Sequence, residues 1–142
     1  MEFKLDNIES VIKKKLKTNQ MLLAISVCIS IAVVYWRIDY VYWALYFALI
    51  GALNLPNINK CKKDLIDYKN NYLSSVKGQV LDFFPETDDE NGNWILYLNV
   101  EGQKDIKEFV ISSNVDIKVN SLVEVFHTNL LHVPVKVCEI NE

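Results

Sequence analysis

Two uncharged apolar segments lie close together in the first half of the chain. They cover residues 21–36 and 41–55, with residues 37–40 between them. As a helix the first segment extends about 24 Å, and the polar residues at its ends bring it close to the ~30 Å of a hydrocarbon core. The rest of the chain is too small to cover two helices that are apolar all round. The pattern predicts a transmembrane helical hairpin over residues 20–58, with a shallow re-entrant hairpin as the alternative.

A basic amphipathic helix is predicted before this hairpin, within residues 1–19. Asp6 and Glu9 have the spacing of a capping box. A basic amphipathic helix beside a membrane span often lies in the headgroup plane, and packing on the following domain is the alternative. The apolar residues that recur there at helical spacing are Leu5, Ile8, Val11, Ile12 and Leu16.

Aromatic residues gather around the connection between the two apolar segments. Tyrosine and tryptophan favour the interface between membrane and water, so a cluster at a tight turn is typical of a hairpin tip at the far interface. The expected membrane-interface residues are Tyr35, Trp36, Arg37, Tyr40, Tyr42 and Trp43.

Lysines flank the hairpin on its outer sides, whereas the connecting turn carries Arg37 offset by Asp39. An excess of lysine and arginine marks the cytoplasmic side of a membrane protein. We therefore expect a multi-pass protein of the cell (inner) membrane with both termini in the cytoplasm. The residues that determine this topology are Lys13, Lys14, Lys15, Lys17, Lys60, Lys62 and Lys63.

Three alanines, Ala44, Ala48 and Ala52, follow one another at four-residue spacing in the second segment. Small residues allow helices to approach closely in lipid, so these are expected to face the first segment or a second copy of the chain. Pro56 is expected to end or kink this helix. Residues 59–76 are predicted to form a connector helix, with a short dimerising coiled coil as the alternative.

From residue 76 onward the apolar residues alternate with a period of two, which predicts strands. Five strands are expected within a domain that covers residues 77–142. Five short strands in so few residues indicate a small closed or half-open β-barrel, OB-like or similar. The predicted fold is thus an α+β membrane protein, a two-helix hairpin followed by a five-stranded barrel. The expected strands cover residues 77–84, 94–100, 106–112, 122–127 and 133–140.

Charge is divided unequally between the two halves of the chain. Residues 1–76 carry ten Lys or Arg and six Asp or Glu, whereas residues 77–142 carry five Lys and twelve Asp or Glu. The basic half is also the apolar half, which favours contact with a lipid bilayer. The acidic half would repel phosphate, so nucleic acid is not an expected partner.

No group of residues in the sequence indicates catalysis, and no cofactor, metal or small-molecule substrate is expected. His127 and His132 are interpreted as solvated turn residues, because zinc spacings are absent. The acidic run at residues 86–90 lacks the ligand pattern of a calcium loop and is interpreted as a solvated hairpin loop or a contact for a basic partner. Three cysteines, none of them in a CxxC pair, are expected to be free thiols.

Residues 117–125, followed by residues 133–137, resemble the closing strands of the OB-type domain in NfeD-like membrane proteins. Ser121 stands near the place of that family's usual glycine before paired valines. The same region is also similar to a widespread family of unknown function with two membrane helices and a β-domain. That similarity rests on Gly78-Gln79-Val80, Tyr97 and Val100-Glu101-Gly102.

Either resemblance implies a scaffold or modulator of membrane protein assemblies, without catalysis. Because the apolar segments carry no charge and the β-domain shows no catalytic set, the leading hypothesis is a membrane-anchored protein-interaction or scaffold module, whose cytoplasmic β-domain binds a protein partner or a second copy by strand addition or through its acidic loop. The alternative is a small immunity- or exclusion-type inhibitory membrane protein that acts through the hairpin itself. An enzyme is the third possibility.

Overall fold

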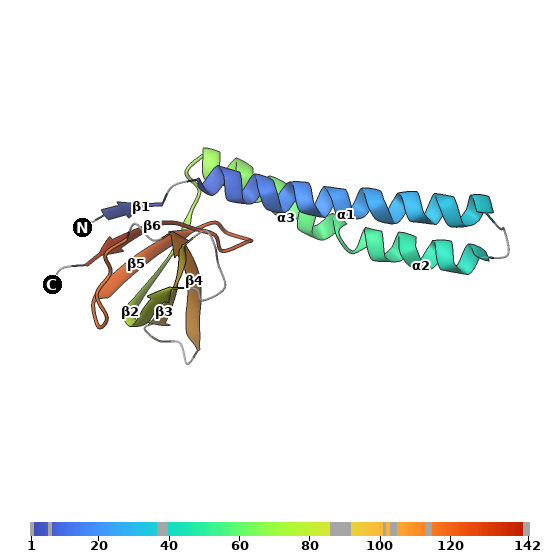
Figure 1. Ribbon diagram of the computed structural model, residues 1–142. Helices are drawn as coiled ribbons and strands as arrows, with labels where there is room; N and C mark the ends of the chain where they lie inside the picture. The colour runs from blue at the N-terminus through green and yellow to red at the C-terminus, as the bar shows by residue number, and fades with distance from the viewer. Residues whose placement is uncertain are drawn as a thin grey trace. The chain divides into compact units, whose positions relative to one another are not determined.

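The computed structural model describes most of the chain in two compact units (Figure 1). Residues Glu9–Ile66 form a helical unit, and Met1–Ile8 together with Asp67–Glu142 form a sheet unit. The predictions that concern Asp6, Arg37 and the acidic run at 86–90 fall outside the described residues. The structure describes residues 2–5, 7–36, 40–85, 92–100, 102, 105–112 and 115–140, without the side chain of Ser112.

The first helix, α1 (Ile8–Trp36), runs without a break through the predicted amphipathic helix and the first apolar segment. The predicted helix within residues 1–19 is therefore not a separate element, because it continues into the first apolar segment. A position of its basic end in the headgroup plane stays a prediction. Among the described residues, two helical stretches, Ile8–Trp36 and Val41–Lys69, are long and apolar enough to cross a membrane.

The second stretch is interrupted once, between α2 (Val41–Ala52) and α3 (Leu55–Lys69). Pro56 has no N–H to donate, and its ring crowds the carbonyl of the preceding turn. The backbone N–H of Asn54 bonds instead to the Gly51 carbonyl at 3.0 Å. The Asn54 side chain donates to the Ile50 carbonyl at 3.3 Å. The predicted end or kink at Pro56 is confirmed.

In the described part of the chain, six antiparallel strands form one sheet in the order β1-β6-β5-β2-β3-β4. The five predicted strands are confirmed. The sixth, at the N-terminal end, was missed because three residues are too few to reveal a period of two. The strands are β1 (Glu2–Lys4), β2 (Ser74–Pro85), β3 (Asn93–Val100), β4 (Ile106–Ser112), β5 (Leu122–His127) and β6 (Pro134–Glu139).

The described strands form an open sheet, and the barrel that the sequence predicted, closed or half-open, does not close between them. Closure of the five predicted strands would require β4 to pair with β6. These two strands contact each other, which shows that the sheet is strongly curved. However, β6 already has β5 on one side and β1 on the other, with Phe3 opposite Val137. Its backbone therefore has no free edge for β4.

One face of the curved sheet carries the core. Buried and partly exposed residues alternate along β5, as expected for a strand with one covered face. Leu96, Leu98 and Val125 are completely buried. The burial of Leu96 and Leu98 at alternate positions agrees with the period of two that predicts this strand.

Replacing Leu96 by alanine should lower the free energy of unfolding by about 2–5 kcal/mol, because it leaves a cavity under the sheet. The measurement is denaturant unfolding in mild detergent, followed by Trp94 fluorescence in a chain in which Trp36 and Trp43 are replaced by Phe. Leu81→Ala is the matched control. Because Leu81 is 39% exposed on a neighbouring strand, this substitution should lower the free energy of unfolding by about 0.5 kcal/mol. Equal losses for the two variants would contradict the assignment of the core.

Candidate membrane-anchoring site

The two legs of the helical unit pack along a seam with alternating three- and four-residue spacing. This spacing places one residue row of each helix against the other, as in an antiparallel coiled coil. In Figure 1 the two legs run side by side in opposite directions. The buried and half-buried residues in this row are Ile12, Leu16, Asn19, Leu23, Ser26, Ser30 and Val33 in α1, and Ala44, Phe47, Gly51, Asn54, Ile58 and Cys61 in the second leg.

The closest approach in the seam lies between Gly51 and Ser26. A Cβ atom added to Gly51 would stand 2.8 Å from the Cβ of Ser26 and 3.4 Å from Cδ1 of Leu23. Such a separation does not occur between real Cβ atoms, so only glycine fits here without a shift of the helices. The Ser30 hydroxyl donates to the Ser26 carbonyl at 2.8 Å, which satisfies this polar side chain within its own helix.

The three alanines expected at a helix contact are placed differently from one another. Ala44 is buried, whereas Ala48 and Ala52 are exposed. A four-residue step overshoots a full turn of a helix, so an unbroken four-residue row drifts away from the seam. Gly51 therefore takes the position at the contact with α1. That the two exposed alanines face a second copy of the chain stays a prediction.

Polar residues from both legs meet further along the seam, away from the connecting turn. The Asn19 side chain donates to the Lys15 carbonyl of its own helix at 3.0 Å. Lys15 and Asp64 lie close enough to the Cys61 thiol to influence it electrostatically. Cys61 and Asp64 are both buried. The proximity of Lys15 to Cys61 agrees with the antiparallel alignment at Gly51 and Ser26.

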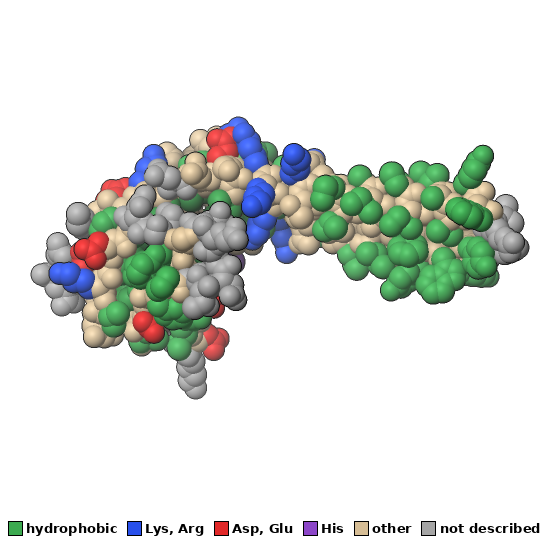
Figure 2. All heavy atoms as spheres, in the orientation of Figure 1, with side chains coloured by type: hydrophobic (Ala, Val, Ile, Leu, Met, Phe, Trp, Pro, Cys, Tyr) green, Lys and Arg blue, Asp and Glu red, His purple; other side chains and the backbone are tan. Residues whose placement is uncertain are grey.

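This alignment brings the lysines on the two legs to one level. The same number of residues separates Lys17 from Ser26 as separates Gly51 from Lys60. Figure 2 shows blue side chains gathered at one end of the apolar hairpin. All of these lysines are exposed. We call this group the lysine collar: Lys13, Lys14, Lys15, Lys17, Lys60, Lys62 and Lys63.

Beyond the lysine collar, apolar side chains cover the outside of both legs (Figure 2). Ile31 is 64% exposed and Leu49 is 67% exposed. Soluble proteins rarely expose contiguous apolar patches above a few hundred Å², and each Å² of apolar surface left in water costs about 25 cal/mol. We call this surface, from residue 21 to residue 36 and from residue 41 to residue 55, the apolar belt.

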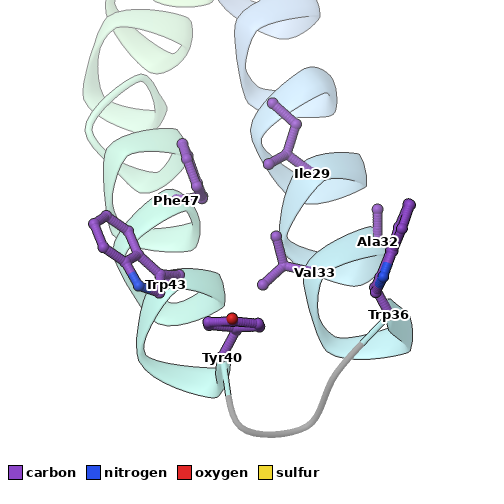
Figure 3. A pocket seen from close by; sticks show the side chains of 7 residues that line it. All are labelled: Ile29, Ala32, Val33, Trp36, Tyr40, Trp43 and Phe47. Atoms are coloured by element: carbon purple, nitrogen blue, oxygen red, sulfur yellow. The ribbon is translucent and has the colours of Figure 1, made fainter.

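The expected interface aromatics lie at the far end of the apolar belt. Tyr35 is 93% exposed and Trp36 is 85% exposed. An open, apolar groove of about 520 Å³ runs between the legs at this end. In Figure 3 the Tyr40 ring lies between the two helices, and Ile29 and Val33 point toward α2. The groove is lined by Ile29, Ala32, Val33, Trp36, Tyr40, Trp43 and Phe47.

The histidines of the sheet unit are not the solvated pair that was expected. His127 is only 3% exposed, its ring lies 5.6 Å from that of Phe109, and Nδ1 lies 2.8 Å from the Thr128 carbonyl. Nδ1 of His132, which is exposed as predicted, lies 3.4 Å from Nδ1 of His127, so the prediction of a solvated residue is wrong for His127 alone. Within the described ranges, no group of three or more His, Cys, Asp or Glu could hold a metal ion.

The edge strand β4 is the part of the sheet unit best exposed for contact. Among the described residues, β4 pairs only with β3. Ile106 is 58% exposed and Val110 is 43% exposed. On the adjoining strand, partial desolvation and the neighbouring Glu108 carboxylate raise the pKa of the Tyr97 phenol above its usual value. This edge therefore offers both backbone groups and apolar side chains.

Of the residues on which the sequence resemblances rest, several lie on the paired strands β2 and β3. Gly78 lies opposite Val100, and Asp82 lies opposite Tyr97, across β2 and β3. Comparison with known proteins found no matching protein family, no similar curated protein and no similar solved structure.

Replacing Gly51 by alanine should destabilise the hairpin by about 1–3 kcal/mol, because the added Cβ overpacks the contact with Ser26. The free energy of unfolding of the helices, measured by circular dichroism in detergent, tests this. Adding Ser26→Gly to Gly51→Ala should restore most of the loss. Ala52→Val is the control at the next, exposed position and should have little effect. A Gly51→Ala chain as stable as the native one would contradict the close approach.

Proposed function

We propose that the chain is a membrane-anchored interaction module, in which the helical hairpin spans the bilayer and the sheet unit binds a protein partner. The apolar belt carries this proposal. It surrounds both legs and includes no charged residue, and Leu49 is more exposed than a core leucine of a soluble domain would be. Such a surface is stable in the hydrocarbon environment of a lipid bilayer.

The lysine collar and the aromatic residues support a transmembrane orientation of the hairpin. Lysines of both legs stand at one level, and Tyr35 and Trp36 stand at the opposite end. A cytoplasmic lysine collar and an aromatic tip at the outer interface fit the charge bias of membrane proteins. In this arrangement both termini and the sheet unit are cytoplasmic.

The sheet unit is proposed to bind its partner along β4. An edge strand presents a row of unpaired backbone groups that can accept a further strand. Ile106 and Val110 would supply apolar contacts beside that row. Because residues 77–142 carry an excess of negative charge, a partner segment with basic residues would be favoured.

A second candidate is an inhibitory protein that acts through the hairpin within the membrane. The open groove at the tip favours it, because such a groove can receive a side chain or helix of another membrane protein. Exchanging residues 20–58 for an unrelated hairpin distinguishes the two: an interaction module keeps its partner, whereas an inhibitor of this kind loses its effect.

Topology can be tested by labelling single cysteines in intact cells with a membrane-impermeant maleimide. Cys61 is unsuitable because it is buried, so a chain with Cys28→Ser, Cys61→Ala and Cys138→Ser is the background. Tyr35→Cys should react from outside, whereas Lys118→Cys should react only after permeabilisation. Labelling of Lys118→Cys in intact cells would overturn the cytoplasmic assignment.

Partner binding along β4 can be tested with a photocrosslinking amino acid placed at Ile106 or Val110. We expect a specific crosslinked protein from either position in living cells. Val119 is the matched control, since it is 49% exposed outside the strands and should give no such product. Products that are the same for all three positions, or absent from both β4 positions, would count against the proposed edge.

A further inference from the structure

We infer that the lysine collar is a binding site for the headgroups of anionic phospholipids. This inference rests on the proposed membrane anchor, and it names the lipid that the anchor prefers. The collar draws Lys13, Lys14, Lys15 and Lys17 from α1 and Lys60, Lys62 and Lys63 from α3. The seam between the legs is what combines these two runs into one cationic site.

Among the described residues, few carboxylates lie on the two helices that carry the collar. Glu9 is the carboxylate of α1, and Asp64 and Asp67 are those of α3. Nζ of Lys13 forms an ion pair with Oε1 of Glu9 at 2.8 Å. In the part of the chain that the structure describes, no carboxylate forms an ion pair with Lys14, Lys17 or Lys60. These ammonium groups are therefore available to an external anion.

The position of the collar identifies that anion as a lipid headgroup. The lysines directly adjoin the apolar belt on both legs, which is where phosphates stand when the belt lies in hydrocarbon. Lysine stems can lie along apolar surface while the ammonium reaches the phosphate level. Anionic lipid attracts such juxtamembrane lysines, and the attraction falls off within a Debye length of the surface. A nucleic acid is disfavoured because the sheet unit is strongly acidic.

The test uses the full chain reconstituted in phosphatidylcholine vesicles. Spin-labelled phosphatidylglycerol or spin-labelled phosphatidylcholine is added in trace amount, and electron paramagnetic resonance measures the fraction of each that the protein immobilises. At low salt the native chain should prefer the anionic lipid by about threefold or more. High salt should reduce this preference.

Two matched variants separate the collar from net charge. Replacing Lys14, Lys17, Lys60 and Lys63 by glutamine should abolish the preference while immobilised phosphatidylcholine stays unchanged. Replacing four exposed or half-exposed lysines of the sheet unit should leave the preference intact, although it removes the same charge. The control substitutions are Lys4→Gln, Lys77→Gln, Lys107→Gln and Lys118→Gln.

The other possible outcomes contradict either the lipid site or the membrane anchor. A native chain without preference at low salt, or a collar variant that keeps it, would overturn the lipid site. If inorganic phosphate removes the preference and chloride at the same ionic strength does not, the collar is a site for free phosphate instead. A chain that immobilises no lipid of either kind would refute the membrane anchor itself, which is a separate failure.

Discussion

The close approach of Gly51 to Ser26 is the constraint on which the helical unit depends. Because a side chain at Gly51 cannot be accommodated, the two legs are held in one antiparallel alignment. This alignment determines which residues stand at equal height on the two legs. The lysine collar and the aromatic end are therefore properties of the pair of helices, and neither leg alone would possess them.

The seam is unusual in that several of its members are polar and small. In lipid, helices gain little from hiding apolar surface from one another, so packing and hydrogen bonds have to hold them together. The Ser30 side chain bonds within its own helix, the Asn54 side chain supports the turn before Pro56, and the Asn19 side chain donates to the Lys15 carbonyl one turn back. Each of these polar side chains is thus satisfied by a backbone carbonyl of its own leg.

Much of the fold was predictable because its elements have strong local periodicity. The apolar segments, the break at Pro56 and the five longer strands all follow from spacing and from proline chemistry. What could not be predicted depends on contacts between distant segments. The pairing of Phe3 with Val137 leaves no local sign, and it turns an expected barrel into an open sheet. The burial of His127 is likewise decided by the covered face of β5, although the residue ends a strand beside a turn.

The candidate site was predicted in its composition but only partly in its geometry. The lysines and the aromatic residues lie at opposite ends of the apolar belt, and their roles in topology and at the interface stay predictions. The helix contact was assigned to a row of alanines, whereas the structure uses Gly51, since the seam follows a three- and four-residue alternation. A row of small residues is visible in a sequence, but the direction in which it points depends on the partner helix.

The pairing of β1 with β6 makes the hairpin an insertion within the sheet unit. During synthesis β1 emerges first and β6 last, so the edge that β1 completes cannot form until the whole hairpin has been made. Bringing the ends of such a long loop together carries an entropic cost. When the two legs of the hairpin have already packed together, the chain turns back on itself and the two ends of the loop come close. This lowers the entropic cost of pairing β1 with β6. Formation of the helical seam therefore favours completion of the sheet, which couples folding of the sheet unit to assembly of the helices.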